Sequence, residues 1–213
     1  MSLRRINFLY SIICIFGYLV FHTVYKLKIE GRENLPQEGP AVILPKHQFW
    51  TDIPIVGLAL GKPASYIAKQ ELFAYPIIRH LITFLGGVPI DRLKPVRSLE
   101  SFRYVEHLLQ KGDFIVLFPE GTYYPHAMGR GKHRFIQRLL NIQEKMGWKS
   151  EKPIPFIPIG IEYEKGKIRG KVTVKFAPPL FAREEAEAVP FTAAILDEIA
   201  KLSGLQPRRE KLE

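Results

Sequence analysis

Residues 41–52 read AVILPKHQFWTD, in which a short apolar run passes through a proline into a cluster of polar and aromatic side chains. A run of this length and β-branched content is typical of a buried strand. The cluster follows the end of that strand, which is where α/β folds tend to bind ligands. The stretch therefore predicts an α/β fold with a functional site at one end of a strand.

Short apolar runs alternate with amphipathic stretches along most of the remaining chain. The runs expected to form strands are 26–30, 41–44, 65–68, 88–90, 114–118, 156–162 and 172–176. The stretches expected to form helices are 53–60, 71–84, 96–110, 133–147 and 191–203. Because strands and helices interleave, we predict an α/β fold with a mixed, mostly buried β-sheet flanked by helices.

The overall composition is that of a globular protein rather than a disordered or fibrous one. The chain has 213 residues, of which 46% are hydrophobic and 24% are charged. This length suits one domain with an appendage. The single cysteine, Cys14, excludes an internal disulfide framework and a cysteine-based zinc cluster.

Residues 8–25 form an apolar segment without a charged side chain, FLYSIICIFGYLVFHTVY. As a helix this segment would be about 27 Å long, which is at the short edge of a bilayer span. Its end offers no small-residue site for cleavage of a signal peptide. We expect an N-terminal apolar membrane-anchoring helix over residues 1–26, which either spans the bilayer or lies in its interface; a buried core helix is the alternative.

The positive charge of the chain is concentrated in two places. Thirty-one Lys and Arg residues against 21 Asp and Glu residues give a net charge of +10. Residues 1–28 hold four basic and no acidic residues, and residues 129–152 hold seven basic and two acidic residues. Both are candidate contacts for phosphate groups, although a solvated helix face explains the second equally well. Nucleic acid is disfavoured, because aromatic residues do not interleave with the basic cluster to form a stacking platform.

His47 and Asp52 are the first candidates for chemistry. A spacing of five is poor for two side chains on one helix face, but it suits a tight turn that leads into a helix. There Asp52 could accept a hydrogen bond from one ring nitrogen of His47 and leave the other nitrogen as a general base. By spacing alone, a structural histidine with a capping aspartate is the simpler interpretation.

Several motifs of other enzyme classes are absent from the sequence. It has no G-x-S-x-G elbow, no P-loop, no G-x-G-x-x-G and no H-E-x-x-H, and its six histidines do not cluster at metal-ligand spacings. If His47 is a base, it most simply deprotonates an acceptor group on the substrate. An activated acyl donor such as a thioester would then need no covalent enzyme intermediate.

Three further blocks have unusual local chemistry. They are GGVPIDR at residues 86–92, FPEGT at residues 118–122 and PFIPIG at residues 155–160. Taken singly they are compatible with a turn, a strand end and an edge strand. Together with His47 and Asp52, in this order and spacing, they resemble the glycerolipid acyltransferase family, which includes the 1-acylglycerol-3-phosphate acyltransferases. The resemblance covers residues 27–180 and implies an acyltransferase domain, which we expect over residues 27–205. The composition predicts a polar tail over residues 206–213.

The resemblance implies roles for individual residues. His47 is the general base and Asp52 the acid that orients it, so that the hydroxyl of a lysophospholipid attacks the thioester of acyl-CoA or acyl-carrier protein, with no bound cofactor and no metal. Arg92 is assigned to the acceptor phosphate, which a guanidinium fork suits well. The remaining assignments, to the acceptor side, are Glu120, Gly121, Thr122 and, less closely, Lys132. Because a carboxylate would repel a phosphate, Glu120 could instead bind a substrate hydroxyl or hold a nearby arginine in place. The resemblance links the block PFIPIG, at residues 155–160, to the acyl donor.

The sequence departs from the family pattern at the position after FPEGT. Tyr123 stands where members that act on lysophosphatidic acid commonly carry an arginine. Lys132, together with Arg130 and Arg134, could supply the missing positive charge. The resemblance implies an acyltransferase of lysophosphatidic acid. With the apolar segment and the positive charge, it leads us to expect an enzyme associated with membrane lipids on the cytoplasmic face of the inner or plasma membrane. The alternatives are another lysolipid acceptor, a transacylase, or a basic membrane-binding protein without catalysis.

Overall fold

The computed structural model describes residues 23, 25–84, 86–91, 98–147, 153–164 and 170–207. Residues 1–22 of the predicted anchor, Arg92 and residues 208–213 of the predicted tail lie outside this part of the chain. Among the residues that are described, none of the helices combines the length and the apolar character needed to cross a membrane.

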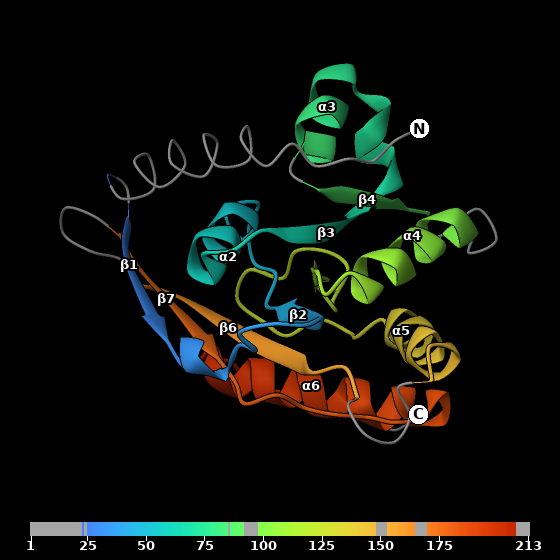
Figure 1. Ribbon diagram of the computed structural model, residues 1–213. Helices are drawn as coiled ribbons and strands as arrows, with labels where there is room; N and C mark the ends of the chain where they lie inside the picture. The colour runs from blue at the N-terminus through green and yellow to red at the C-terminus, as the bar shows by residue number, and fades with distance from the viewer. Residues whose placement is uncertain are drawn as a thin grey trace.

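A seven-stranded mixed sheet forms the centre of the fold (Figure 1). Its strands are β1 (Tyr25–Glu30), β2 (Ala41–Pro45), β3 (Ala64–Lys69), β4 (Gly87–Ile90), β5 (Phe114–Val116), β6 (Phe156–Glu164) and β7 (Gly170–Phe176). Across the sheet they follow the order β1-β7-β6-β2-β5-β3-β4. Only β6 and β7 pair antiparallel; every other pair of neighbours is parallel. The prediction of a mixed sheet is confirmed, and each predicted strand is present, although β5 ends two residues earlier than expected.

The α-helices are α2 (Asp52–Leu60), α3 (Pro76–Phe84), α4 (Leu99–Gln110), α5 (His133–Lys145) and α6 (Ala188–Leu202). Short 3₁₀ turns are η1 (Arg32–Asn34), η2 (Gln70–Ala74) and η4 (Glu185–Glu187). The prediction of one continuous helix over residues 71–84 is wrong, because this stretch forms the 3₁₀ turn η2 and then the separate helix α3. Tyr75 has extended dihedrals, φ −88° and ψ 116°, as expected for a residue whose helical conformation is disfavoured by a following proline.

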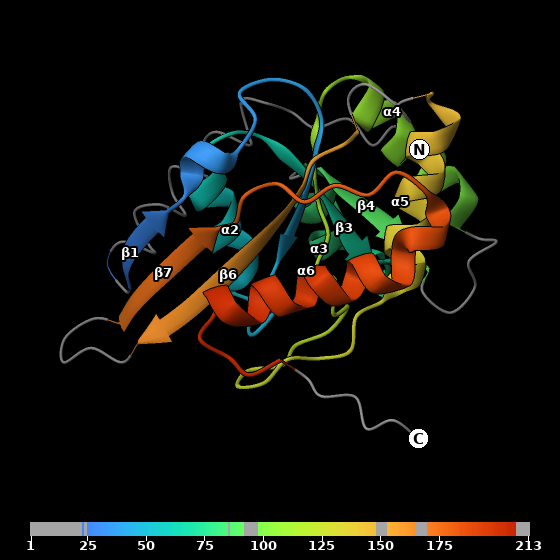
Figure 2. The ribbon, with the colours of Figure 1, turned by 90° about the horizontal axis from the view of Figure 1, so that it is seen from below.

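The sheet lies between two layers of apolar packing. Alternate residues of a strand point to opposite faces, so Val42 and Leu44 of β2 pack with α4, α5 and α6, while Ala41 and Ile43 pack with α2. Figure 1 shows α2 on one side of the sheet and α6 on the other, and Figure 2 shows α6 lying across β6. Burial of both faces explains why the strand sequences are almost continuously apolar.

The central position of β2 determines which segments meet at the site. β2 lies between β5 and β6 and is parallel to both, so all three strands end at the same edge of the sheet. Pro45, the last residue of β2, pairs with Ile159, and β6 continues past that point to Glu164. The last residues of β6 therefore lie beside the loop that follows β2.

Candidate active site

His47 and Asp52 meet across the loop between β2 and α2. His47 follows β2 by two residues, and Asp52 is the first residue of α2. The Nδ1 atom of His47 lies 3.2 Å from Oδ2 of Asp52. The Asp52 side chain is fully buried, and 10% of the His47 side chain is exposed. The pair can therefore be reached only through the histidine ring.

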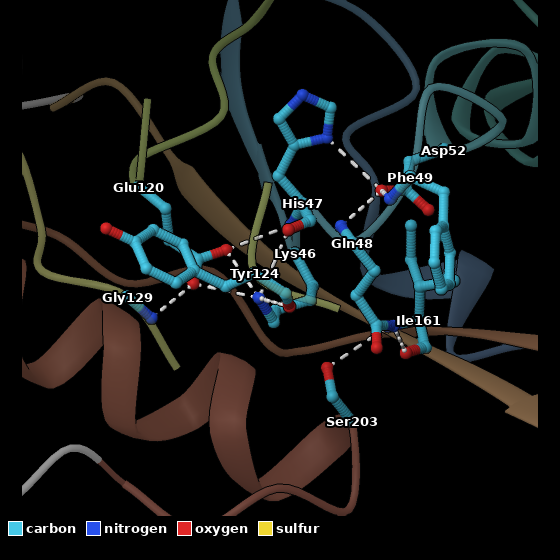
Figure 3. A network of polar contacts seen from close by, with 10 residues as sticks. All are labelled: Lys46, His47, Gln48, Phe49, Asp52, Glu120, Tyr124, Gly129, Ile161 and Ser203. Atoms are coloured by element: carbon cyan, nitrogen blue, oxygen red, sulfur yellow. Dashed lines mark hydrogen bonds and ion pairs between the residues drawn. The ribbon is translucent and has the colours of Figure 1, made fainter. Parts of the chain in front are cut away.

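The Asp52 carboxylate also holds the loop itself in place. Its Oδ2 atom accepts hydrogen bonds from the backbone N–H groups of Gln48, at 2.5 Å, and Phe49, at 2.7 Å (Figure 3). Its Oδ1 atom accepts a hydrogen bond from the hydroxyl of Tyr163, at 2.5 Å. Because several donors surround it, the buried carboxylate is fully hydrogen-bonded and its orientation is fixed.

The ring of His47 packs against two aromatic side chains. Phe118 stacks on it with the ring centroids 3.9 Å apart, and Tyr123 lies against it at 4.3 Å and an interplanar angle of 56°. Figure 3 shows the Nε2 corner of the ring pointing away from Asp52. When Nδ1 carries the proton and donates it to Asp52, Nε2 is the acceptor. In that tautomer the hydrogen-bond acceptor of the ring is directed away from the carboxylate.

A buried ion pair contacts the backbone of His47. The ammonium group of Lys46 lies 2.8 Å from both carboxylate oxygens of Glu120, and both side chains are fully buried. Lys46 also donates to the carbonyl oxygens of His47, at 3.2 Å, and Tyr124, at 3.0 Å. Glu120 accepts in addition from the backbone N–H groups of His47, at 3.0 Å, and Gly129, at 2.6 Å (Figure 3). Burial lowers the pKa of Lys46, and the contact with Glu120 opposes that shift by stabilising the ammonium form.

These contacts tie the loop after β5 to the loop after β2. The resemblance predicts that Glu120 shapes the acceptor site, and the structure places its carboxylate inside the protein, on Lys46 and two backbone amides. Gly121 has φ +72°, a left-handed conformation that glycine adopts without steric cost, and its N–H donates to the carbonyl of Phe118 at 3.0 Å. The carbonyl of His47 accepts the N–H of Tyr124 at 2.9 Å.

The other predicted acceptor residues lie at the surface of this loop or outside the described chain. Thr122 is exposed, and so is Lys132, which directly precedes α5. The N–H of Lys132 donates to the carbonyl of Pro119 at 2.9 Å, which closes the loop on itself. Arg92 follows the last described residue after β4, Asp91, so its distance from His47 is not part of the structure.

Two contributors to the site had no role in the sequence analysis. Lys46 stands beside His47 in the sequence, but nothing in the pattern indicates that its side chain turns inward. Tyr163 is 111 positions from Asp52, and only the parallel pairing of β6 with β2 brings it to the loop. Among the described residues, no group of three or more His, Cys, Asp and Glu side chains could hold a metal ion.

The fold and the site together define an α/β protein in which a histidine–aspartate pair lies at the carboxyl edge of a mostly parallel sheet, in the loop that follows its central strand β2. The model of the Acyltransferase family matches residues 26–162, which is more than half of the chain. The chain therefore belongs to the acyltransferase family.

Named relatives point in the same direction. The chain is 36% identical over 119 residues to a chloroplastic 1-acyl-sn-glycerol-3-phosphate acyltransferase of Arabidopsis thaliana, a match that covers 55% of this chain and 33% of the relative. It is 34% identical over 102 residues to the enzyme of that name in Pseudomonas aeruginosa, which covers 47% of this chain and 38% of the relative. The chain thus spans about a third of the length of these curated relatives.

A solved structure shares the fold along almost the whole chain. It is the 1-acyl-sn-glycerophosphate acyltransferase of Thermotoga maritima, with a TM-score of 0.66 and 23% sequence identity. The superposition covers 96% of this chain and 83% of that one. At this level of identity the likeness shows the fold alone.

Proposed function

We propose that this protein transfers an acyl chain from acyl-CoA or acyl-carrier protein to the free hydroxyl of lysophosphatidic acid, and so produces phosphatidic acid. The observation that carries the proposal is the contact of His47 with the buried Asp52, which leaves Nε2 directed away from the carboxylate. The names of the relatives support the acceptor class.

His47 acts as the general base in the proposed reaction. Its Nε2 takes the proton of the acceptor hydroxyl while the hydroxyl oxygen attacks the carbonyl carbon of the thioester. Asp52 stabilises the imidazolium that forms. The carbon–sulfur bond then breaks, and the leaving thiolate takes the proton from Nε2. The products are the ester and the free thiol, and His47 returns to its starting state.

The acceptor headgroup is proposed to bind near the loops that follow β4 and β5. Arg92 contacts the phosphate, and Thr122 and Lys132 lie on the exposed surface of the second loop. Glu120 and Gly121 contribute by holding that loop in shape. The burial of the Glu120 carboxylate against Lys46 supports this division of roles.

Another lysolipid acceptor is the second candidate, and the position of Tyr123 favours it. This side chain stands where the resemblance expects an arginine, and its ring lies against His47. A phenol adjacent to the base offers an apolar surface and one hydroxyl group instead of a positive charge. An acceptor whose headgroup is less anionic than a phosphate monoester would suit that surface.

The enzyme is proposed to work at a membrane surface. Its acceptor and product are amphiphiles held in a bilayer, and the apolar segment 8–25 would keep the site near them. Basic residues near an anionic leaflet contribute about 1 kcal/mol each to binding. We propose the cytoplasmic face of the inner or plasma membrane, where acyl-CoA and acyl-carrier protein are available.

The test is acyl transfer from both donor types to a panel of lysolipids, with wild type beside His47→Ala. We expect His47→Ala to lower kcat by about 10²-fold to 10⁴-fold, the usual contribution of a general base. His107→Ala is the matched control, because His107 is an exposed histidine on α4. It should retain wild-type activity.

The pattern across the panel separates the candidates. Histidine-dependent acylation of lysophosphatidic acid supports the first proposal, and histidine-dependent acylation of only another lysolipid supports the second. A folded His47→Ala variant with near-wild-type turnover would refute the mechanism for both acceptors. Circular dichroism of each variant establishes that it is folded.

A further inference from the structure

Tyr163, near the end of β6, contacts the Asp52 oxygen that His47 does not contact. Its hydroxyl lies 2.5 Å from Oδ1 of Asp52 and 3.1 Å from the hydroxyl of Thr51. The ring of Phe49 packs edge-on against it, with centroids 5.2 Å apart and an interplanar angle of 88°. The phenol is thus held against the carboxylate by contacts on several sides.

Tyr163 is the donor in this contact. Burial, and next the negative charge of Asp52, raise the pKa of Tyr163 above its ordinary value, so the phenol keeps its proton over the assay range. An ionised carboxylate can only accept hydrogen bonds. The O–H bond of Tyr163 therefore points at Asp52 and offsets part of its negative charge.

We propose that Tyr163 is a positioning residue for acyl transfer, whose hydroxyl holds Asp52 in place and weakens the attraction between Asp52 and protonated His47. The proposal rests on the proposed function, in which His47 is the base. A carboxylate that lacks this hydrogen bond would attract the imidazolium more strongly. His47 would then stay protonated, and unable to accept a proton, up to a higher pH.

Other titratable groups surround the pair within the described residues, and a change of Tyr163 to phenylalanine leaves all of them in place. Lys46 and Glu120 lie behind His47 as an ion pair. Tyr123 faces the ring of His47 from the loop after β5, and burial, with the charge of Asp52, raises its pKa so that it stays neutral. Tyr25 of β1 packs edge-on against the ring of Tyr163, with centroids 6.1 Å apart.

The experiment is a pH titration of His47 by NMR in Tyr163→Phe, which removes one oxygen atom and keeps the ring. The full chain is labelled at the histidine Cε1 positions, and the His47 signal is assigned by its loss in His47→Ala. We expect the pKa of the His47–Asp52 pair to rise by up to about one unit, the size of one hydrogen bond. The acid limb of kcat/KM should move to higher pH by the same amount.

Tyr104→Phe is the matched control, because it removes the same hydroxyl from a partly buried tyrosine on α4. It should leave the His47 titration unchanged. An unchanged or lowered pKa in a folded Tyr163→Phe variant overturns the proposal, as does a loss of activity that is uniform over pH. If His47→Ala stays active, the proposed role of His47 as the base is refuted. The NMR titration of Tyr163→Phe still shows in that case whether the Tyr163 hydroxyl affects the His47–Asp52 pair.

Discussion

At the residue scale, the ion pair of Lys46 and Glu120 is the contact on which the shape of the site depends. Both side chains are fully buried, and the Glu120 carboxylate also accepts hydrogen bonds from the backbone N–H groups of His47 and Gly129. A buried ion pair of this kind is a weak source of net stability, but removing one partner leaves the other charge uncompensated. The pair thus joins the histidine loop to the loop that follows β5.

Glu120→Gln is expected to lower the free energy of unfolding by about 3–5 kcal/mol, because Lys46 would be left as a buried charge without its counter-ion. Urea unfolding followed by circular dichroism measures the change. The control is Glu164→Gln, which removes a carboxylate from an exposed pair with Lys171 and should be indistinguishable from wild type. If Glu120→Gln instead kept wild-type stability and only raised the acceptor KM, the carboxylate would be a substrate contact.

At the element scale, the packing of α6 on β6 explains the glycine that ends the block PFIPIG at residues 155–160. Gly160 lies in β6 directly beneath the end of α6, and a Cβ atom there would lie 2.4 Å from Cβ of Leu202. It would also lie 2.5 Å from the carbonyl carbon of Leu202. The glycine therefore lets the helix and the strand approach closely.

Gly160→Ala is expected to destabilise the fold by about 1–3 kcal/mol, since overpacking forces α6 away from the sheet. The midpoint of thermal or urea unfolding should fall accordingly. Lys201→Ala, on the exposed side of the same helix, tests whether any change in α6 has this effect, and it should shift the midpoint little. A fully stable Gly160→Ala variant would show that the helix can adjust, and that close packing is not required.

At the scale of the whole molecule, one edge of the sheet gathers segments that are far apart in the sequence. His47 follows β2, Glu120 follows β5, and Tyr163 lies near the end of β6. The parallel pairing of these three strands aligns their ends, and Figure 3 shows side chains from the two loops and the backbone of β6 in one network. The site is therefore a property of the sheet topology, in line with the rule for open α/β sheets.

The proposed membrane attachment also concerns the whole molecule, because it would place the entire site near the bilayer. If the segment 8–25 inserts into lipid, about 1 M salt should leave the protein in the membrane pellet, since screening at that ionic strength removes only electrostatic binding. A variant that lacks residues 1–22 should appear in the supernatant after the same wash. Release of the full-length chain by salt alone would contradict an apolar anchor.

The sequence by itself determined the class of fold and the positions of the strands. It also led to the hypothesis that His47 contacts Asp52. These follow from local signals: apolar runs, turn residues and the spacing of reactive side chains near a strand end. Proline also acts locally, and the break between η2 and α3 at Pro76 could have been predicted from that residue alone.

Only the tertiary structure decided what surrounds the histidine. Tyr163 reaches Asp52 because β6 pairs in parallel with β2, and Glu120 turns inward because Lys46 offers it a buried counter-charge. Strand order and the partner of a buried charge depend on contacts between distant segments, and no local pattern in a single chain encodes them. The physical reason is that a buried charge needs a partner wherever the fold places one, whatever the distance along the sequence.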